Sequence, residues 1–313
     1  MFGQFTDAQE RRESPSRGAI PAARTGAVCD DGAMPAAAPI APTSSLPILS
    51  VKLIPASIVA TSAIALFAFE NRFVGYPWLL AGLIVAYFVD RELLRDLGII
   101  AAGLIVVSTV SVKADISWPN FFLLGFVLSL AVAVPFALDR FVLKRRVIRF
   151  PWRGGQKWQP WEKSYLFAVP FLGWLILPFY FISSGTYQNW PAVSEFSEVA
   201  RLFIGVNAVG IWDELFFICT CYVLLLRHFP LLVANILQSI IFVSFLWELG
   251  YQAWGPLMTI PFALLQGWIF HRTKSLTYVI IVHLLFDLIV FLAIVHAHNP
   301  GVFPFFLIAA PGS

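Results

Sequence analysis

The sequence predicts an all-α fold, an integral membrane protein built as a polytopic bundle of about eight or nine transmembrane helices. Hydrophobic residues make up 59% of the chain and charged residues only 12%, a composition outside the range of soluble globular domains. Apolar runs recur along the chain, and most approach the roughly 20 residues that a membrane-spanning helix requires. Lys and Arg cluster in alternate connections between these runs, which is typical of a chain that crosses a membrane repeatedly.

Residues 1–48 differ from the rest and should form a disordered tail, because Pro, Ala, Ser and Gly dominate and no apolar face repeats. A group of N-terminal transmembrane helices follows over residues 49–183, and a C-terminal core over residues 200–295. The candidate spans are 53–69, 74–89, 97–112, 119–138, 165–183, 201–226, 230–250, 256–270 and 276–295. The second and third are short, so a tilted or re-entrant element there would change the number of spans.

The positive charges predict the orientation in the membrane. With a cytoplasmic N-terminus, every Lys and Arg falls on the cytoplasmic side except Arg72, Lys113 and Arg201. We therefore expect a multi-pass protein of the cell inner membrane whose N-terminus is cytoplasmic. The longest connection, residues 139–164, interleaves basic residues with tryptophans. This pattern predicts a cytoplasmic loop that binds the lipid bilayer surface, and no nucleic acid.

Five ionisable residues in the C-terminal apolar runs are the strongest functional signal, because a charge at a helix centre costs roughly 2.5–3.5 kcal/mol in a membrane. They are Asp213, Glu214, Glu248, His283 and Asp287. His283 and Asp287 are four residues apart and so share one helix face. Asp213 and Glu214 are adjacent and diverge by ~100°. Only one of them should point straight at a common site, while the other faces a neighbouring helix, a cavity or a capping group.

The helical rise predicts how deep each residue lies. At ~1.5 Å per residue from the flanking cations, Asp213 and Asp287 both lie roughly 20 Å into the membrane. Glu248 lies roughly 30 Å in on the same scale, at the mouth of a cavity rather than its base. Such a set could activate a water, hold zinc or another divalent metal, or relay a proton in a transporter. It could also make only structural polar contacts between helices.

The C-terminal core resembles the CAAX-protease and bacteriocin-processing (Abi) family, which comprises intramembrane endopeptidases and bacteriocin self-immunity proteins. The family pattern is Glu-Glu-x-x-x-Arg on one helix, Phe-x-x-x-His on a second and His-x-x-x-Asn/Asp on a third. The resemblance covers about residues 200–295 and rests on Asp213-Glu214, on the Phe242-rich helix and on the stretch Gly267–Asp287.

This resemblance implies roles for the polar residues. Asp213 would activate the attacking water, and Glu214 would take the place of the second Glu. His283 and Asp287 would stabilise the oxyanion of the tetrahedral intermediate or bind a metal, so the enzyme would be a glutamic or a metallo-type peptidase.

Two positions depart from the family pattern. Ile218 stands where the Arg would be, and Leu246 stands at the His position if Phe242 is the anchor. Glu248 is the only nearby replacement and could line or complete the site, but it lies ~200° around the helix from Leu246.

Three functions therefore remain open. The first is an intramembrane endopeptidase that cleaves a membrane-associated peptide or protein. The second, which the two departures favour, is a family member without peptidase activity that binds a peptide or a lipid. The third is a transporter, although the polar set is not repeated in the N-terminal half as inverted-repeat transporters would show.

Overall fold

The computed structural model describes residues 50–152 and 157–312, and every regular element in these ranges is a helix. The predicted tail, residues 1–48, lies outside the described residues. The α-helices are α1 (Leu53–Ala63), α2 (Arg72–Val89), α3 (Arg91–Val107), α4 (Trp118–Ala137), α5 (Pro160–Ser184), α6 (Phe196–Asp213), α7 (Val223–Leu225), α8 (Leu231–Leu249), α9 (Gly255–Thr273) and α10 (Leu276–His298). The π-helices η2 (Ile64–Ala68), η3 (Leu138–Val142) and η5 (Glu214–Tyr222) continue α1, α4 and α6, and η4 (Thr186–Asn189) is a 3-10 helix.

Six of the helices in the described ranges are long and apolar enough to cross a membrane, and Leu53–Ala68 is a shorter apolar helix. The six spans are Arg72–Val89, Trp118–Val142, Pro160–Ser184, Phe196–Leu225, Leu231–Leu249 and Leu276–His298. The predicted all-α, multi-pass membrane bundle is therefore confirmed. The third and eighth predicted spans coincide with α3 and α9, which do not meet the same length and composition threshold. The predicted sidedness stays a prediction.

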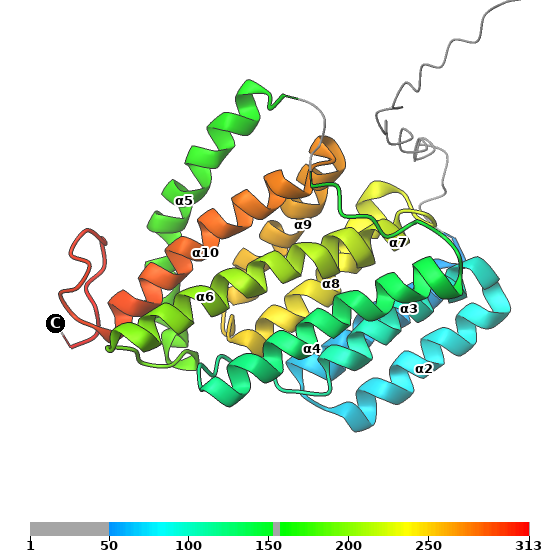
Figure 1. The fold of residues 1–313 in the computed structure, drawn as a ribbon, viewed down its shortest axis with the longest axis horizontal. Helices are drawn as coiled ribbons and strands as arrows, with labels where there is room; N and C mark the ends of the chain where they lie inside the picture. The colour runs from blue at the N-terminus through cyan, green and yellow to red at the C-terminus, as the bar shows by residue number, and fades with distance from the viewer. Residues whose placement is uncertain (1–49, 153–156, 313) are drawn as a thin grey trace, which may run out of the picture. The chain divides into compact units, whose positions relative to one another are not determined.

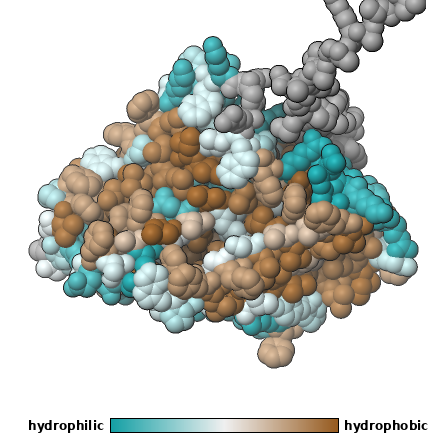
Figure 2. Space-filling model, in the orientation of Figure 1, coloured by the Kyte–Doolittle hydropathy of each residue, from teal (hydrophilic) through white to brown (hydrophobic). Residues whose placement is uncertain are grey.

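Helix α10 has neighbours from both parts of the chain. This helix packs against α5 and against α6, and α9 precedes it in a hairpin (Figure 1). The neighbouring α8 packs against α9, α1 and η5, while α3 pairs with α4. Hydrophobic residues cover much of the visible face over the helices (Figure 2). Exposed aromatic side chains such as Phe73, Phe88, Phe126 and Phe167 suit contact with lipid.

Capping side chains fix the starts of several helices. Asn71 accepts a hydrogen bond from the Val74 amide at the start of α2, and Asp90 accepts one of 2.8 Å from the Leu93 amide at the start of α3. Lys52, 2.6 Å from Asp90, adds an ion pair, and together these contacts hold the pKa of the Asp90 carboxyl at about 2. The hairpins between the helices are thus set by local hydrogen bonds.

A buried ionic cluster around Asp96 joins α3 to the C-terminal core. The carboxylate of Asp96, 1% exposed, accepts a hydrogen bond of 2.7 Å from Arg145, which follows η3. It also contacts Arg227 and, at 2.7 Å, His228, both of which follow α7. Arg145 further contacts Asp139 of η3. One cation of the predicted lipid-binding loop is therefore used inside the protein.

We predict that Asp96→Ala lowers the free energy of unfolding by about 3 kcal/mol, because it leaves Arg145, Arg227 and His228 without their shared partner. Unfolding in detergent, followed by circular dichroism, measures the change. Glu92→Gln is the matched control, since Glu92 lies 3.6 Å from Arg145 and 3.7 Å from Arg227 but is half-exposed. Its effect should stay below about 1 kcal/mol, and equal effects of the two substitutions would contradict the assignment.

Candidate active site

The centre of the site is the imidazole of His283, on α10, which is buried. Its Nδ1 lies 2.7 Å from Oε1 of Glu214, the first residue of η5. The same oxygen accepts a hydrogen bond of 2.6 Å from Nε2 of Gln266 on α9. Because an ionised carboxylate only accepts hydrogen bonds, we assign a proton to Nδ1 at this contact. Glu214 thereby sets the orientation of the ring and turns Nε2 to the opposite side.

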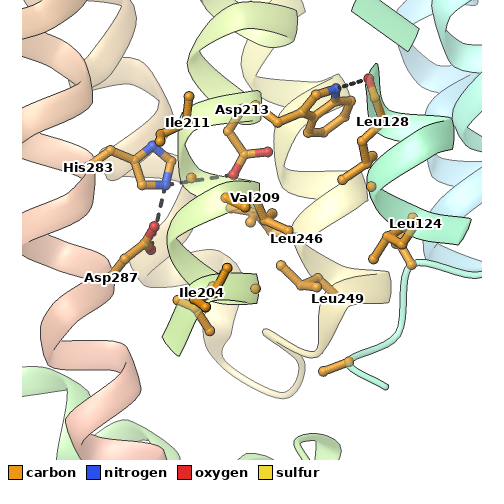
Figure 3. A pocket seen from close by; sticks show the side chains of 18 of the residues that line it. Leu124, Leu128, Ile204, Val209, Ile211, Asp213, Leu246, Leu249, His283 and Asp287 are labelled. Carbon is orange, nitrogen blue, oxygen red and sulfur yellow. Dashed lines mark hydrogen bonds and ion pairs between the residues drawn. The ribbon is translucent and has the colours of Figure 1, made fainter. Parts of the chain in front are cut away.

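Two more carboxylates face Nε2 of His283 (Figure 3). Oδ2 of Asp213, the last residue of α6, and Oδ1 of Asp287, one turn along α10, each lie 3.7 Å from this nitrogen. These separations are those of ion pairs and are too long for direct hydrogen bonds. Both carboxylates are buried. Asp213 and Asp287 thus meet at one imidazole nitrogen, and their common depth in the membrane stays a prediction.

Asp213 and Glu214 both reach the imidazole, so the expectation that only one points straight at a common site is wrong. An imidazole presents two nitrogens on opposite sides of its ring, and the ~100° between adjacent helical residues lets each carboxylate approach a different one. The chain also changes from α-helix to π-helix at Glu214, a local distortion that is frequent at functional sites. Through Gln266, Glu214 faces the neighbouring helix α9 as well, which is one of the alternatives predicted.

Glycine and aromatic residues shape the space around His283. A Cβ added to Gly210 of α6 would overlap Oδ2 of Asp287 and lie 3.1 Å from Cδ2 of His283. The absence of a side chain there lets α6 and α10 approach closely. On α9, Phe262 packs edge-on against the imidazole at 5.0 Å, and Phe242 of α8 lies 6.2 Å away. The ring is thus held by packing as well as by Glu214.

His283, Asp213 and Asp287 line a cavity of about 670 Å³ whose walls are mainly apolar. Figure 3 shows Leu124 and Leu128 of α4 facing the site, with Val209 of α6 and Leu246 of α8. Beside them, the indole of Trp212 donates a hydrogen bond of 2.8 Å to the Leu128 carbonyl. The N-terminal helix α4 therefore supplies one wall of the cavity, and Trp212 holds α6 against it.

Glu248 does not join this group. Its carboxylate accepts hydrogen bonds of 3.3 Å from the Ser111 hydroxyl and 3.1 Å from the Val112 amide, both in the connection between α3 and α4. It does not line the cavity. The geometry instead gives Glu248 a role in holding that connection against the end of α8.

Gln266 is a residue of the site that the sequence analysis does not single out. An uncharged amide escapes a search for ionisable residues in apolar helices. The signal was nevertheless available, since ~1.5 Å per residue from Lys274 places Gln266 roughly 12 Å deep and His283 roughly 13 Å deep. A polar residue at the depth of the histidine, on the preceding helix of a hairpin, is a candidate partner.

Comparison with known families agrees with this geometry. Residues 195–289 match the family model of the type II CAAX prenyl endopeptidases, Rce1-like. No curated protein and no solved structure matched the chain. The match contains Asp213, Glu214, His283 and Asp287, and it confirms the resemblance inferred for residues 200–295.

The two departures from the family pattern lie in different surroundings. Leu246 lines the cavity, and Phe242, one turn earlier, stacks on Phe217 at 4.4 Å. The position of the family's second-helix histidine therefore faces the site but offers no polar group. Ile218 is fully buried in η5 and does not line the cavity. The region similar to the CAAX endopeptidases thus matches the third motif in full and the first in part, and His283 contacts the acidic residues of both.

The fit of a metal ion can be tested against the donor set. In the described part of the chain, no group of three or more His, Cys, Asp or Glu residues is arranged to hold one. Nδ1 of His283 is engaged by Glu214, which leaves Nε2 as its one nitrogen open to another partner. The mechanism below therefore uses no zinc or other divalent metal.

We predict that Gly210→Ala lowers both activity and stability, because the added methyl displaces Asp287 or separates α6 from α10. Overpacking of this kind should reduce the free energy of unfolding by about 1–3 kcal/mol. Gly205→Ala, on the same helix, is the control, since its nearest neighbour would be Phe121 at 3.9 Å. Thermal unfolding of both variants in nanodiscs measures the difference, and similar unfolding temperatures for both would argue against a close approach at Gly210.

We predict that Gln266→Leu misorients Glu214 and lowers the free energy of unfolding by about 1.5–3 kcal/mol, the range for a hydrogen bond to a charged group. Gln238→Leu is the matched control, because Gln238 is likewise a buried amide that joins two helices, here α8 and α9, but it contacts Asn235, Ser239 and the Ala263 carbonyl instead. Both variants should unfold more easily, but only Gln266→Leu should impair function at the site. Equal activity of the two variants would contradict a role for Gln266 in the site.

Proposed function

We propose that the protein is an intramembrane endopeptidase, with Asp213, Glu214, His283 and Asp287 as its catalytic machinery. The observation that carries this proposal is the buried imidazole that Glu214 orients and that faces two aspartates at the wall of an apolar cavity. Similarity of residues 195–289 to prenyl endopeptidases supports the reaction class. Ionisable residues within membrane-spanning helices usually face the bundle interior and mark a functional site.

Asp213 is the candidate general base. Its Oδ1 is buried without a hydrogen-bond partner among the described residues, while its Oδ2 faces His283. In the proposed reaction Asp213 takes a proton from water as the water oxygen bonds to the scissile carbonyl carbon, and the carbonyl π electrons move to its oxygen. Collapse of this tetrahedral intermediate breaks the carbon–nitrogen bond, and the leaving nitrogen receives the proton from Asp213.

His283 is the candidate stabiliser of the transition state. With Nδ1 donating to Glu214, a proton on Nε2 points into the cavity and could bond to the developing oxyanion. Asp287 lies beside Nε2 and favours the positive charge on the ring that this role needs. Glu214 and Gln266 act indirectly, because they fix the orientation of the imidazole ring.

The substrate we propose is a membrane-associated peptide or protein. The apolar walls favour a segment that enters from the bilayer, and an inner-membrane location with a cytoplasmic N-terminus would bring the basic connection beside the lipid headgroups.

A second candidate function, peptide or lipid binding without cleavage, is favoured by one observation. Leu246 faces the cavity where the family pattern has a histidine, so one polar group of that pattern is missing from the wall. In this case the aspartates and His283 would contribute to affinity alone.

Peptide cleavage by the purified protein in nanodiscs separates the two functions. We expect wild-type cleavage of a membrane-peptide library and at least a 100-fold loss in Asp213→Asn, since general bases typically contribute about 10²–10⁴-fold. We expect a similar loss in His283→Ala, since removing one oxyanion donor costs about 10²–10³-fold. Glu92→Gln, an exposed carboxylate changed to an amide, is the control. Metal content is measured in the same samples. Cleavage unchanged in both site variants would remove the mechanism, and intact protein without any cleavage would favour the binding function.

Glu248→Gln, measured alongside, decides the role of the remaining carboxylate that the sequence predicts for the site. Its contacts with Ser111 and Val112 lead us to expect cleavage close to wild type and a lower unfolding temperature. A loss of cleavage activity as large as that of Asp213→Asn would show that Glu248 takes part in catalysis.

A further inference from the structure

Two hydroxyl groups of the cavity wall have no hydrogen-bond partner among the described residues. Oγ1 of Thr259, on α9, is buried and unpaired. A threonine in a helix usually donates to the carbonyl one turn back, as Thr61 does to Ser57 and Thr273 does to Ile269. Thr259 lines the cavity without this local bond. Its hydroxyl proton is therefore available to a ligand.

The register of the α9–α10 hairpin places Thr259 beside the active site. Gln266 of α9 reaches the Val279 carbonyl of α10, and Phe262 packs against His283 and stacks on Phe286 at 4.6 Å. Thr259 lies one turn further along α9 in the same direction, so it is level with Asp287. It shares the cavity with both residues.

The second hydroxyl belongs to Tyr251, which follows α8. Its ring is buried and fixed by three aromatic neighbours, Trp190 at 5.2 Å, Phe181 at 5.9 Å and Tyr180 at 6.5 Å. Tyr251 also lines the cavity, together with Asp213 and Asp287. A ring held in place by packing, whose hydroxyl has no hydrogen-bond partner among the described residues, is preorganised to donate a hydrogen bond to a ligand.

We propose that the hydroxyls of Thr259 and Tyr251 bind the oxygen of the scissile carbonyl and stabilise it as it becomes an oxyanion. They would supply donors that Leu246, which lines the same cavity, does not. The inference rests on the proposed peptidase function. As the water oxygen bonds to the carbonyl carbon, the carbonyl oxygen gains the electron pair. The two O–H groups and Nε2 of His283 then surround that oxygen and transfer no proton to it.

The test compares isosteric variants that remove only the hydroxyls, Thr259→Val and Tyr251→Phe. We expect each to reduce kcat by roughly 100-fold with little change in KM, because an oxyanion donor acts mainly in the transition state. Thr259→Ser should retain activity. Tyr222→Phe is the control, since the Tyr222 hydroxyl is also buried and unpaired but does not line the cavity. Unfolding temperatures confirm that each variant is folded.

A peptide with a phosphinate in place of the scissile amide separates this inference from the proposed function. Its tetrahedral oxygens mimic the intermediate, so Thr259→Val and Tyr251→Phe should bind it at least tenfold more weakly than wild type, whereas Tyr222→Phe should not. Cleavage and phosphinate binding that are unchanged in both variants would overturn the hydroxyl roles and leave the peptidase intact. A wild type that does not cleave would overturn the peptidase and, with it, the oxyanion role of the two hydroxyls, whether or not it binds the phosphinate.

Discussion

The hydrogen bond between Glu214 and His283 is the interaction on which the rest of the site depends. A neutral or charged imidazole in an apolar bundle could rotate or face either neighbour, and Glu214 removes this freedom by engaging Nδ1. Nε2 is then directed at Asp213, Asp287 and the cavity. Gln266 engages the same oxygen of Glu214, so three helical segments meet at one carboxylate. Gln266 thus holds Glu214, and Glu214 holds His283. Buried polar groups need such partners, because leaving them unpaired in an apolar surrounding costs free energy.

This polar centre constrains the packing of helices that carry no catalytic residue. Asp287 reaches the site only because Gly210 leaves space on α6. Trp212 fixes α6 to α4, whose leucines close the cavity, and Asp96 connects α3 to the segment after α7. The region that matches the family model, residues 195–289, therefore does not enclose its own cavity. The N-terminal helices are part of the site because an apolar wall is needed to keep water from the charges.

Much of this arrangement could be predicted from single-helix rules. The four-residue spacing of His283 and Asp287 and the helical rise to Asp213 identified the central residues. These rules do not predict which residues of two different helices lie side by side. Gln266 and Thr259 enter the site through the register of the α9–α10 hairpin, which no spacing within one helix encodes. The charge of Glu248 led the sequence analysis to place it in the site. Its carboxylate instead accepts hydrogen bonds from Ser111 and Val112, in the connection between α3 and α4.

The loss of a histidine at position 246 has a physical consequence that reaches beyond that position. A leucine there lines the cavity with an apolar side chain, so this position offers no hydrogen-bond donor to a ligand. A transition-state charge in such a low-dielectric space needs several fixed donors, because one imidazole cannot surround an oxyanion. A buried hydroxyl without a partner, such as that of Thr259, is therefore costly unless a ligand uses it. Thr259 on α9 and Tyr251 in the connection after α8 would supply such donors to the cavity, which would let the site tolerate Leu246.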